Sequence, residues 1–475
     1  MSIPVYEKAD SGNLDLLLVN PSLDWKLDQK EKLVKRIENN IPNQETPHIG
    51  MAYLLAVARK LGLKSKYIDM VMDGVAIEEL LDYMATARPT LIGFTAFTIQ
   101  IRTAGIIAAQ IKRELPSTTI CVGGPHAAAT PKQTLDEFPS FDFIVCGEGE
   151  GLIPKILGAM GNEDKLSKLP GVVTRNGGQV AWQPITNVDD LPFPAWEDFN
   201  LSKYPGTYPH RTKLELPLIS ARGCPYHCVF CCRALGHVMR LRSVQSVVAE
   251  IERDIEEFGC ESIAFLDETF VLNKKWSDEF FTTMIARGLN KRITWSCSTR
   301  VDRASPELLC RMRKAGCYYI FFGLESADDT TLKAIKKGIT VEQIRNVVKW
   351  TKQAGIIPVG AFIIGLPGDT EEHVFKAIRL AEELDLYSVT FPIAVPFPGT
   401  ELRDMALRHV HGMKIISDNW DDYGKQAPGV MESEDFPWSK RTELQKVAYA
   451  RNPKRHLDNY LQMLRNMEPN SASAI

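Results

Sequence analysis

Segments typical of β-strands alternate with segments typical of α-helices in two separate series along this chain of 475 residues. The strand-like segments are almost continuously apolar, as in parallel strands that are covered on both faces. In the first series they are Leu14–Asn20, Lys66–Val71, Thr90–Phe97, Thr118–Gly123 and Asp142–Gly147. Repeated strand–helix units predict an α/β fold whose first domain, residues 13–165, is a doubly wound, Rossmann-like sheet. Its ligand should lie at the carboxyl ends of the strands.

The second series predicts a different arrangement of the same units. Its candidate strands are Leu216–Ser220, Ser262–Asp267, Ile293–Thr299, Tyr318–Glu325, Val359–Gly365 and Ser388–Val395. Six strand–helix units in succession predict a partial (β/α)6 barrel over residues 214–420, again with its chemistry at the carboxyl ends of the strands. We expect residues 166–213, which are rich in proline, to be a linker and residues 421–475 to be a helical tail.

Charge and hydropathy exclude several classes of protein. The chain carries 56 Lys and Arg against 59 Asp and Glu, which argues against a nucleic-acid partner held by bulk positive charge. No apolar run approaches the roughly 20 residues that span a bilayer. The segment Met1–Ser11 lacks the apolar core of a signal peptide. We therefore expect a soluble, cytoplasmic protein.

The ten cysteines are distributed unevenly. Six are isolated, mostly within apolar stretches where a thiol packs as a small hydrophobe. The other four, Cys224, Cys228, Cys231 and Cys232, follow the first predicted strand of the barrel. Three thiolates of this loop could bind one metal centre. A structural zinc site needs four closing ligands, and no second CxxC pair supplies them, so the spacing favours an iron–sulfur cluster with one open iron.

The spacing CxxxCxxC after the first barrel strand, with the aromatic Phe230 before the last cysteine, resembles the radical S-adenosylmethionine (SAM) superfamily. The resemblance implies that Cys224, Cys228 and Cys231 bind a [4Fe–4S] cluster whose open iron binds SAM. Reduction then cleaves SAM to a 5′-deoxyadenosyl radical that abstracts hydrogen from the substrate.

The resemblance also implies SAM contacts at the ends of the later barrel strands. Asp267 and Glu268 are expected near the SAM amino group, and Arg300 near its carboxylate. Glu325 is expected at the ribose hydroxyls and Gly365 near the adenine. Each position alone is weak support, but their order along one barrel is specific.

A doubly wound domain directly before such a barrel resembles the cobalamin-binding domain of the B12-dependent radical SAM subfamily. The resemblance implies cobalamin contacts in the loops after the strands, at Thr95, Phe97, Gly123, Gly124, Gly147 and Glu148. The Asp-x-His-x-x-Gly motif that supplies a cobalt-binding histidine is absent, since His48-Ile-Gly50 lacks its aspartate and its spacing. The cobalt is therefore expected to lack a protein histidine ligand.

The resemblance implies an enzyme that methylates an unactivated carbon of a small-molecule or lipid substrate. Methylcobalamin would donate the methyl group, and a second SAM would restore it. A non-methylating rearrangement, ring closure or contraction, or oxidation of a tetrapyrrole or isoprenoid lipid is the alternative within the family. A zinc-stabilised binding module is the alternative from another class. An electron donor such as flavodoxin or ferredoxin is implied, and the basic C-terminal segment could contact a membrane surface peripherally.

Overall fold

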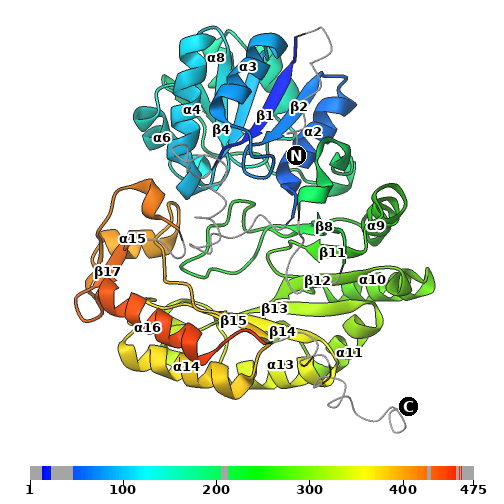
Figure 1. The fold of residues 1–475 in the computed structure, drawn as a ribbon, viewed down its shortest axis with the longest axis vertical. Helices are drawn as coiled ribbons and strands as arrows, with labels where there is room; N and C mark the ends of the chain where they lie inside the picture. Colours follow the sequence, from blue (N-terminus) through cyan, green and yellow to red (C-terminus); the bar gives the residue numbers. More distant parts are fainter. Residues whose placement is uncertain are drawn as a thin grey trace. The chain divides into compact units, whose positions relative to one another are not determined.

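The computed structural model describes residues 13–22, 46–204, 212–424 and 429–455, together with residues 459 and 462 (Figure 1). The described residues form two compact units. Unit 1 takes those of Met1–Tyr204, Phe397–Gly399 and Asn419–Ala427, and unit 2 takes those of the remaining segments.

Unit 1 is built on a sheet with the strand order β2-β1-β3-β4-β5-β6-β7. Its parallel strands are β1 (Leu16–Asn20), β2 (Ser65–Asp69), β3 (Leu91–Thr95), β4 (Thr119–Gly123) and β5 (Phe143–Val145). They confirm the five strands predicted for the first series and the doubly wound fold. The strand order reverses beside β1, so a crevice at the carboxyl ends of β1 and β3 is the expected place for a ligand.

The helices of unit 1 follow the apolar periodicity of the sequence. They are α2 (Ile49–Lys60), α3 (Ile77–Ala87), α4 (Ile101–Glu114), α5 (Pro125–Ala129), α6 (Pro131–Glu137), α7 (Ile153–Ala159) and α8 (Glu163–Leu166). In α4, for example, Ile101, Ala104, Ile107, Ala108 and Ile111 recur at helical spacing, and all of them are buried. His48 caps α2, because its Nδ1 accepts a hydrogen bond from Met51 N at 3.4 Å.

The segment that the sequence predicts as a linker belongs in large part to unit 1. Strands β6 (Val172–Thr174) and β7 (Gly177–Gly178) extend the sheet in antiparallel fashion. Beyond them Trp196, Phe199 and Tyr204 are buried. The prolines exclude long helices here, but the aromatic side chains between them have enough apolar surface to pack onto the domain.

A later part of the chain also completes unit 1. The short helix η8 (Trp420–Asp422) packs next to α4 and the turn before it. Trp420 donates a hydrogen bond from Nε1 to Glu137 Oε2 at 2.7 Å and lies edge-on to His126, with ring centroids 4.8 Å apart. Arg102 and Asp421 form an ion pair at 2.8 Å.

Unit 2 contains a parallel sheet with the order β15-β14-β13-β12-β11-β8, in which each strand pairs with its predecessor in this series. The strands are β8 (Glu215–Leu218), β11 (Ser262–Phe265), β12 (Thr294–Thr299), β13 (Cys317–Glu325), β14 (Ile357–Phe362) and β15 (Ser388–Thr390). All six predicted barrel strands are confirmed. Among the described residues β8 and β15 are the edges of the sheet, so the barrel is partial.

The helices of unit 2 lie outside this sheet (Figure 1). They are α9 (Val244–Phe258), α10 (Lys274–Ala286), α11 (Pro306–Lys314), α12 (Asp329–Ala334), α13 (Val341–Gln353) and α14 (Glu371–Leu384). Side chains cap the N-termini of these helices. Ser305 caps α11, Thr340 and Gln343 form a capping box on α13, and Thr370 caps α14.

The C-terminal part of unit 2 packs on this barrel. It contains α15 (Glu401–Leu407), β16 (Met413–Ile415), β17 (Met431–Ser433) and α16 (Trp438–Arg451), and α16 packs against α14. Two basic side chains of the segment that was expected to contact a membrane form ion pairs with acidic residues. Arg451 pairs with Glu382 at 2.7 Å, and Lys440 pairs with Glu371 at 3.4 Å. Most of the predicted tail beyond Arg455 lies outside the described residues.

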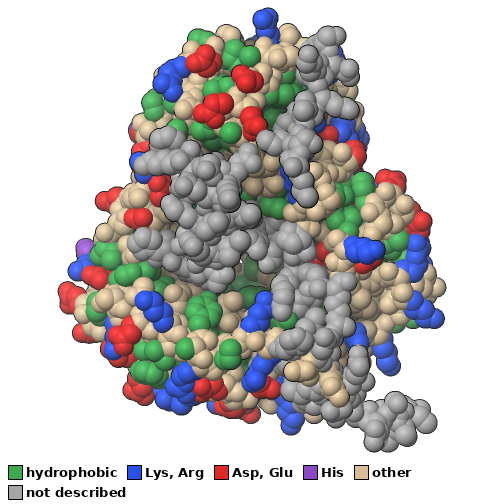
Figure 2. All heavy atoms as spheres, viewed as in Figure 1, with side chains coloured by type: hydrophobic (Ala, Val, Ile, Leu, Met, Phe, Trp, Pro, Cys, Tyr) green, Lys and Arg blue, Asp and Glu red, His purple; other side chains and the backbone are tan. Residues whose placement is uncertain are grey.

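Charged side chains of both signs are interspersed over the side of unit 2 that carries α14 and α16 (Figure 2). None of the helices in the described part of the chain combines the length and the apolarity needed to cross a membrane.

Candidate functional site

The three cysteines of the CxxxCxxC sequence lie in one loop of unit 2, just beyond β8. The loop is closed at its base by the antiparallel pair β9 (Ala221–Arg222) and β10 (Arg240–Leu241). Gly223 allows this closure, because it has a φ of +92° and a Cβ there would lie 2.4 Å from the Val238 carbonyl oxygen. Cys228 is buried, Cys224 is half-buried and Cys231 is exposed.

Two of these thiols interact directly. The hydrogen bond from Cys231 lowers the pKa of Cys228 to about 6 against the effect of burial, and the nearby charge of Lys337 contributes in the same direction. The same contact raises the pKa of Cys231. The third thiol, Cys224 Sγ, lies 3.9 Å from the hydroxyl of Thr269 at the end of β11. Iron–sulfur clusters bind cysteine thiolates, and the lowered pKa of Cys228 favours its thiolate form. The three thiols therefore suit such a cluster.

The carboxyl group of Asp267, which the sequence places near the SAM amino group, accepts hydrogen bonds from the protein itself. Its Oδ1 accepts hydrogen bonds from the backbone N–H groups of Ser220 and Ala221, and its Oδ2 accepts one from Ser220 Oγ at 2.9 Å. Burial raises the pKa of this carboxyl to about 7. Asp267 therefore fixes the turn that leads into the cysteine loop. The neighbouring Glu268 is the more exposed residue of the pair, although partial burial of its carboxyl raises the pKa to about 7.

Arg300 lies at the end of β12 and faces the cysteine loop. Its guanidinium carbon lies 3.7 Å from the ring centroid of Tyr226, a residue between the first two cysteines. Asp302 accepts two hydrogen bonds from Arg300, at 2.8 and 3.2 Å, and the Lys337 carbonyl accepts a third. These contacts fix the plane of the guanidinium beside the loop. The sequence singled out Arg300 but did not identify Tyr226 as its stacking partner.

Glu325 ends β13 with a φ of +63° and forms a buried ion pair that the sequence did not reveal. Lys337 Nζ donates to Glu325 Oε1 at 2.7 Å, and both side chains are more than nine-tenths buried. Gly323 makes room for the pair, because a Cβ there would lie 2.3 Å from Glu325 Oε1 and 2.7 Å from Lys337 Nζ. The Lys336-Lys337 dipeptide gives no sign that one of its lysines is buried.

Gly365 follows β14 by three residues and adopts a left-handed turn with a φ of +84°. The buried guanidinium of Arg441, from α16, packs directly on it, so that a Cβ on Gly365 would lie 2.4 Å from Arg441 Nη1. Phe230, between the last two cysteines of the motif, packs against a cluster that includes Leu402 and Met431. Sequence-predicted residues of all these strand ends thus border the same edge of the parallel sheet.

In unit 1 the residues predicted to contact cobalamin lie at the carboxyl ends of β3, β4 and β5. Gly124 has a φ of +94°, and a Cβ there would lie 2.8 Å from the Ala96 carbonyl oxygen, so the loops after β3 and β4 approach closely. Thr95 is buried, whereas Phe97 exposes 54% of its surface. Gly123 ends β4 beside β5. An exposed aromatic ring next to a glycine-rich loop suits a large planar ligand.

Gly147 and Glu148, the other two predicted contacts, support the segment after β7. The indole of Trp182 lies over Gly147, where a Cβ would come within 2.1 Å of the ring, and Glu148 Oε2 accepts a hydrogen bond from Ile185 N at 2.7 Å. Glu148, Lys155, Trp182 and Ile185 are among the residues that line a cavity of about 240 Å³.

The isolated cysteines and metal-binding geometry complete the description. Five of the six isolated cysteines are buried and Cys310 is exposed. In the described ranges, no three side chains among His, Cys, Asp and Glu are arranged to hold a single metal ion.

Two family models match the chain in the order of the two units. The model of the B12 binding domain matches residues 41–157, and that of the radical SAM superfamily matches residues 218–381. An uncharacterized methyltransferase of Pyrococcus horikoshii is 32% identical over 412 residues, which are 85% of this chain and 87% of that protein.

Two further proteins extend the comparison. The anaerobic magnesium-protoporphyrin IX monomethyl ester cyclase of Cereibacter sphaeroides is 30% identical over 374 residues, which are 75% of this chain but only 60% of the cyclase. The structure of TsrM, a radical SAM methyltransferase from Kitasatospora setae with tryptophan and a SAM analog bound, matches with a TM-score of 0.68 and 17% identity. That match covers 92% of this chain and 89% of TsrM, and it supports the fold. By the two family models and the extensive match to the Pyrococcus protein, the chain belongs to the cobalamin-dependent radical SAM family of enzymes.

Proposed function

We propose that this protein methylates an unactivated carbon atom of a small-molecule or lipid substrate. The proposal is carried by the cysteine loop at the carboxyl end of β8, in a chain that is 32% identical to a relative named as a methyltransferase. A doubly wound unit with a glycine-rich ligand edge supports the use of a second cofactor.

Different residues of unit 2 would bind the iron–sulfur cluster and SAM. Cys224, Cys228 and Cys231 would hold the [4Fe–4S] cluster, and the buried Lys337 offsets negative charge beside Cys228. The carboxyl of Glu268, whose pKa is raised to about 7 by partial burial, suits the SAM ammonium group, and the stacked guanidinium of Arg300 suits the SAM carboxylate. When bound, the cofactors of the family supply hydrogen abstraction and methyl transfer, and the protein supplies orientation and exclusion of water.

The remaining predicted contacts complete the two cofactor sites. Glu325 and the Gly365 turn would border the SAM ribose and adenine. In unit 1, Thr95, Phe97, Gly123 and Gly124 would border cobalamin. Gly147 and Glu148 act there through the segment that they support, since both contact residues 182–185.

A second candidate is a non-methylating radical reaction such as ring closure. It is favoured by the 30% identity to an enzyme named as a cyclase. Family membership decides against the zinc-stabilised binding module, because the family consists of enzymes.

Anaerobic reconstitution with iron, sulfide, SAM and cobalamin tests the proposal. The substrate source is a metabolite extract from a strain that lacks the gene, and Cys228→Ala is the control. Methyl transfer should produce S-adenosylhomocysteine together with 5′-deoxyadenosine. Accumulation of 5′-deoxyadenosine without S-adenosylhomocysteine would support the cyclase-type reaction instead, and a colourless protein that takes up no iron would refute both.

Other partners follow from the same chemistry. A reductant such as flavodoxin or ferredoxin would supply the electron for SAM cleavage in a cytoplasmic setting, with no role for nucleic acid. Peripheral membrane contact through the C-terminal segment has less support, because Lys440 and Arg451 are engaged with acids of α14.

A further inference from the structure

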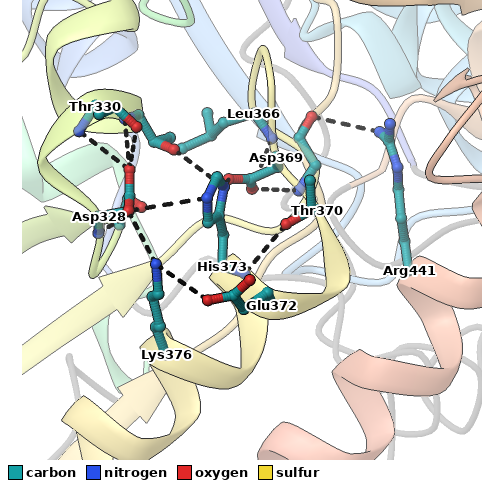
Figure 3. A network of polar contacts seen from close by, with 12 residues as sticks. Asp328, Thr330, Leu366, Asp369, Thr370, Glu372, His373, Lys376 and Arg441 are labelled. Carbon is teal, nitrogen blue, oxygen red and sulfur yellow. Dashed lines mark hydrogen bonds and ion pairs between the residues drawn. The ribbon is translucent and has the colours of Figure 1, made fainter.

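The loop after β14 is closed by an aspartate that the proposed function does not use. Asp369 Oδ2 accepts hydrogen bonds from the backbone N–H groups of Gly365 at 3.0 Å and Leu366 at 3.1 Å (Figure 3). Gly365 and Gly368 both adopt left-handed conformations, so the turn is tight. The second oxygen, Asp369 Oδ1, is buried and has no hydrogen-bond partner among the described residues.

The imidazole of His373 lies between that oxygen and a second carboxylate. His373 Nδ1 is 3.5 Å from the hydroxyl of Thr331 and 3.7 Å from Asp369 Oδ1, and His373 Nε2 is 3.8 Å from Asp328 Oδ2 (Figure 3). Asp328 caps α12 and follows β13 closely, accepting hydrogen bonds from the N–H groups of Thr330 and Thr331. One imidazole therefore faces carboxylates from the loops after two neighbouring strands, β13 and β14.

The surrounding charges determine which form of the imidazole is favoured. Although desolvation opposes it, hydrogen bonds from Thr330, Thr331 and Lys376 hold the pKa of Asp328 at about 2, so this carboxylate stays ionised. Lys376 Nζ lies 3.3 Å from Asp328 Oδ2 and also forms an ion pair with Glu372. The guanidinium of Arg441, on α16, interacts electrostatically with the carboxylate of Asp369. The contact with Asp369, which outweighs desolvation, and the charge of Asp328 raise the pKa of His373 above its ordinary value of 6.5.

We propose that His373 is a positioning residue that, as an imidazolium, ties the loop after β13 to the loop after β14 and thereby supports SAM binding. The inference rests on the proposed function, which assigns Glu325 and Gly365 at the starts of these two loops to SAM. In this proposal His373 does not touch SAM. It acts on the two loops through Asp328 and Asp369.

The sign of the pH dependence follows from protonation. The imidazolium link is fully present below pH about 6.5 and is lost as the pH rises through the raised pKa of His373. SAM affinity of the reconstituted holoprotein should therefore fall about two- to fivefold with rising pH, the upper part of the range measured for ion pairs that are not fully buried.

Equilibrium dialysis with radiolabelled SAM at a series of pH values tests this, with the holoproteins of wild type, His373→Gln and Asp328→Asn. Both variants should bind SAM weakly at all pH values and lose the pH dependence. His411→Asn, an exposed histidine outside this network, should behave as the wild type. Hydrogen exchange supplies a second readout, since the amides of Gly365 and Leu366 should exchange faster in His373→Gln.

The outcomes are distinguishable. An identical pH profile in wild type and His373→Gln, with unchanged amide exchange, would overturn the inference while leaving the proposed function intact. If no form of the protein binds SAM at any pH, the proposed function fails and the inference fails with it.

Discussion

Replacing Lys337 with methionine should destabilise unit 2 far more than the same change at the neighbouring Lys336. Both lysines form ion pairs at 2.7 Å, Lys337 with Glu325 and Lys336 with Glu401. They differ in burial. The side chains of the first pair are 8% and 7% exposed, and those of the second are 53% and 35% exposed. The two substitutions therefore isolate the effect of burial at constant chemistry and distance.

The magnitudes follow from that difference. Lys337→Met leaves a buried carboxylate without its cation, which typically costs about 3–5 kcal/mol. Lys336→Met removes an exposed pair, which typically contributes about 0–1 kcal/mol. For a unit of this size each kcal/mol corresponds to roughly 2–4 °C, so Lys337→Met should lower the Tm by at least about 6 °C.

Urea unfolding of the cofactor-free protein gives the free-energy difference, and thermal unfolding gives the difference in Tm. Both are followed by tryptophan fluorescence and circular dichroism under reducing conditions, without added stabilisation from ligands. The double variant Lys337→Met with Glu325→Gln should recover much of the loss, because the orphaned charge is gone. Equal losses for Lys337→Met and Lys336→Met, or no recovery in the double variant, would show that the buried pair does not act as described.

Three further substitutions test the site. Cys228→Ala should abolish cluster assembly, measured as bound iron and sulfide, while Cys310→Ala, at an exposed cysteine, should retain it; full assembly in Cys228→Ala would contradict the ligand assignment. Gly365→Ala should cost about 1–3 kcal/mol more than Gly368→Ala, because both have positive φ but only the first meets a guanidinium; equal losses in urea unfolding would contradict this. Asp267 retains its proton up to about pH 7, so the stability advantage of the wild type over Asp267→Asn should shrink as the pH rises from about 4 to 7, and a constant difference would count against the raised pKa.

The strands of both units could be predicted because their burial leaves a direct signal in the sequence. Leu91–Thr95 and Thr119–Gly123 read as apolar runs since both faces of the sheet are covered. The cysteine loop could also be located from the sequence, because three cysteines with the spacing CxxxCxxC fall within eight residues. Local patterns of this kind depend on neighbouring residues alone.

The contacts that the sequence did not reveal depend on residues distant along the chain. Lys337 resembles a solvated lysine until β13 brings Glu325 against it. In the sequence Asp267 resembles an acid that binds a ligand. In the structure its Oδ1 accepts hydrogen bonds from the backbone N–H groups of Ser220 and Ala221. Arg441 meets Gly365 only through the packing of α16 on the barrel. Ion pairs and hydrogen bonds to the backbone between residues far apart in the sequence produce no periodic pattern in the sequence.

The position of Trp420 in unit 1 affects how the protein can be divided for expression. Because Phe397–Gly399 and the described residues of Asn419–Ala427 belong to the same unit as the segment that ends at Tyr204, no single cut of the chain yields both units whole. A fragment that stops at Tyr204 would lack the indole that covers His126 and bonds Glu137. A synthetic peptide of residues 417–424 should bind such a fragment and protect it from proteolysis, so fragment complementation, rather than truncation, is the practical route to unit 1 in isolation.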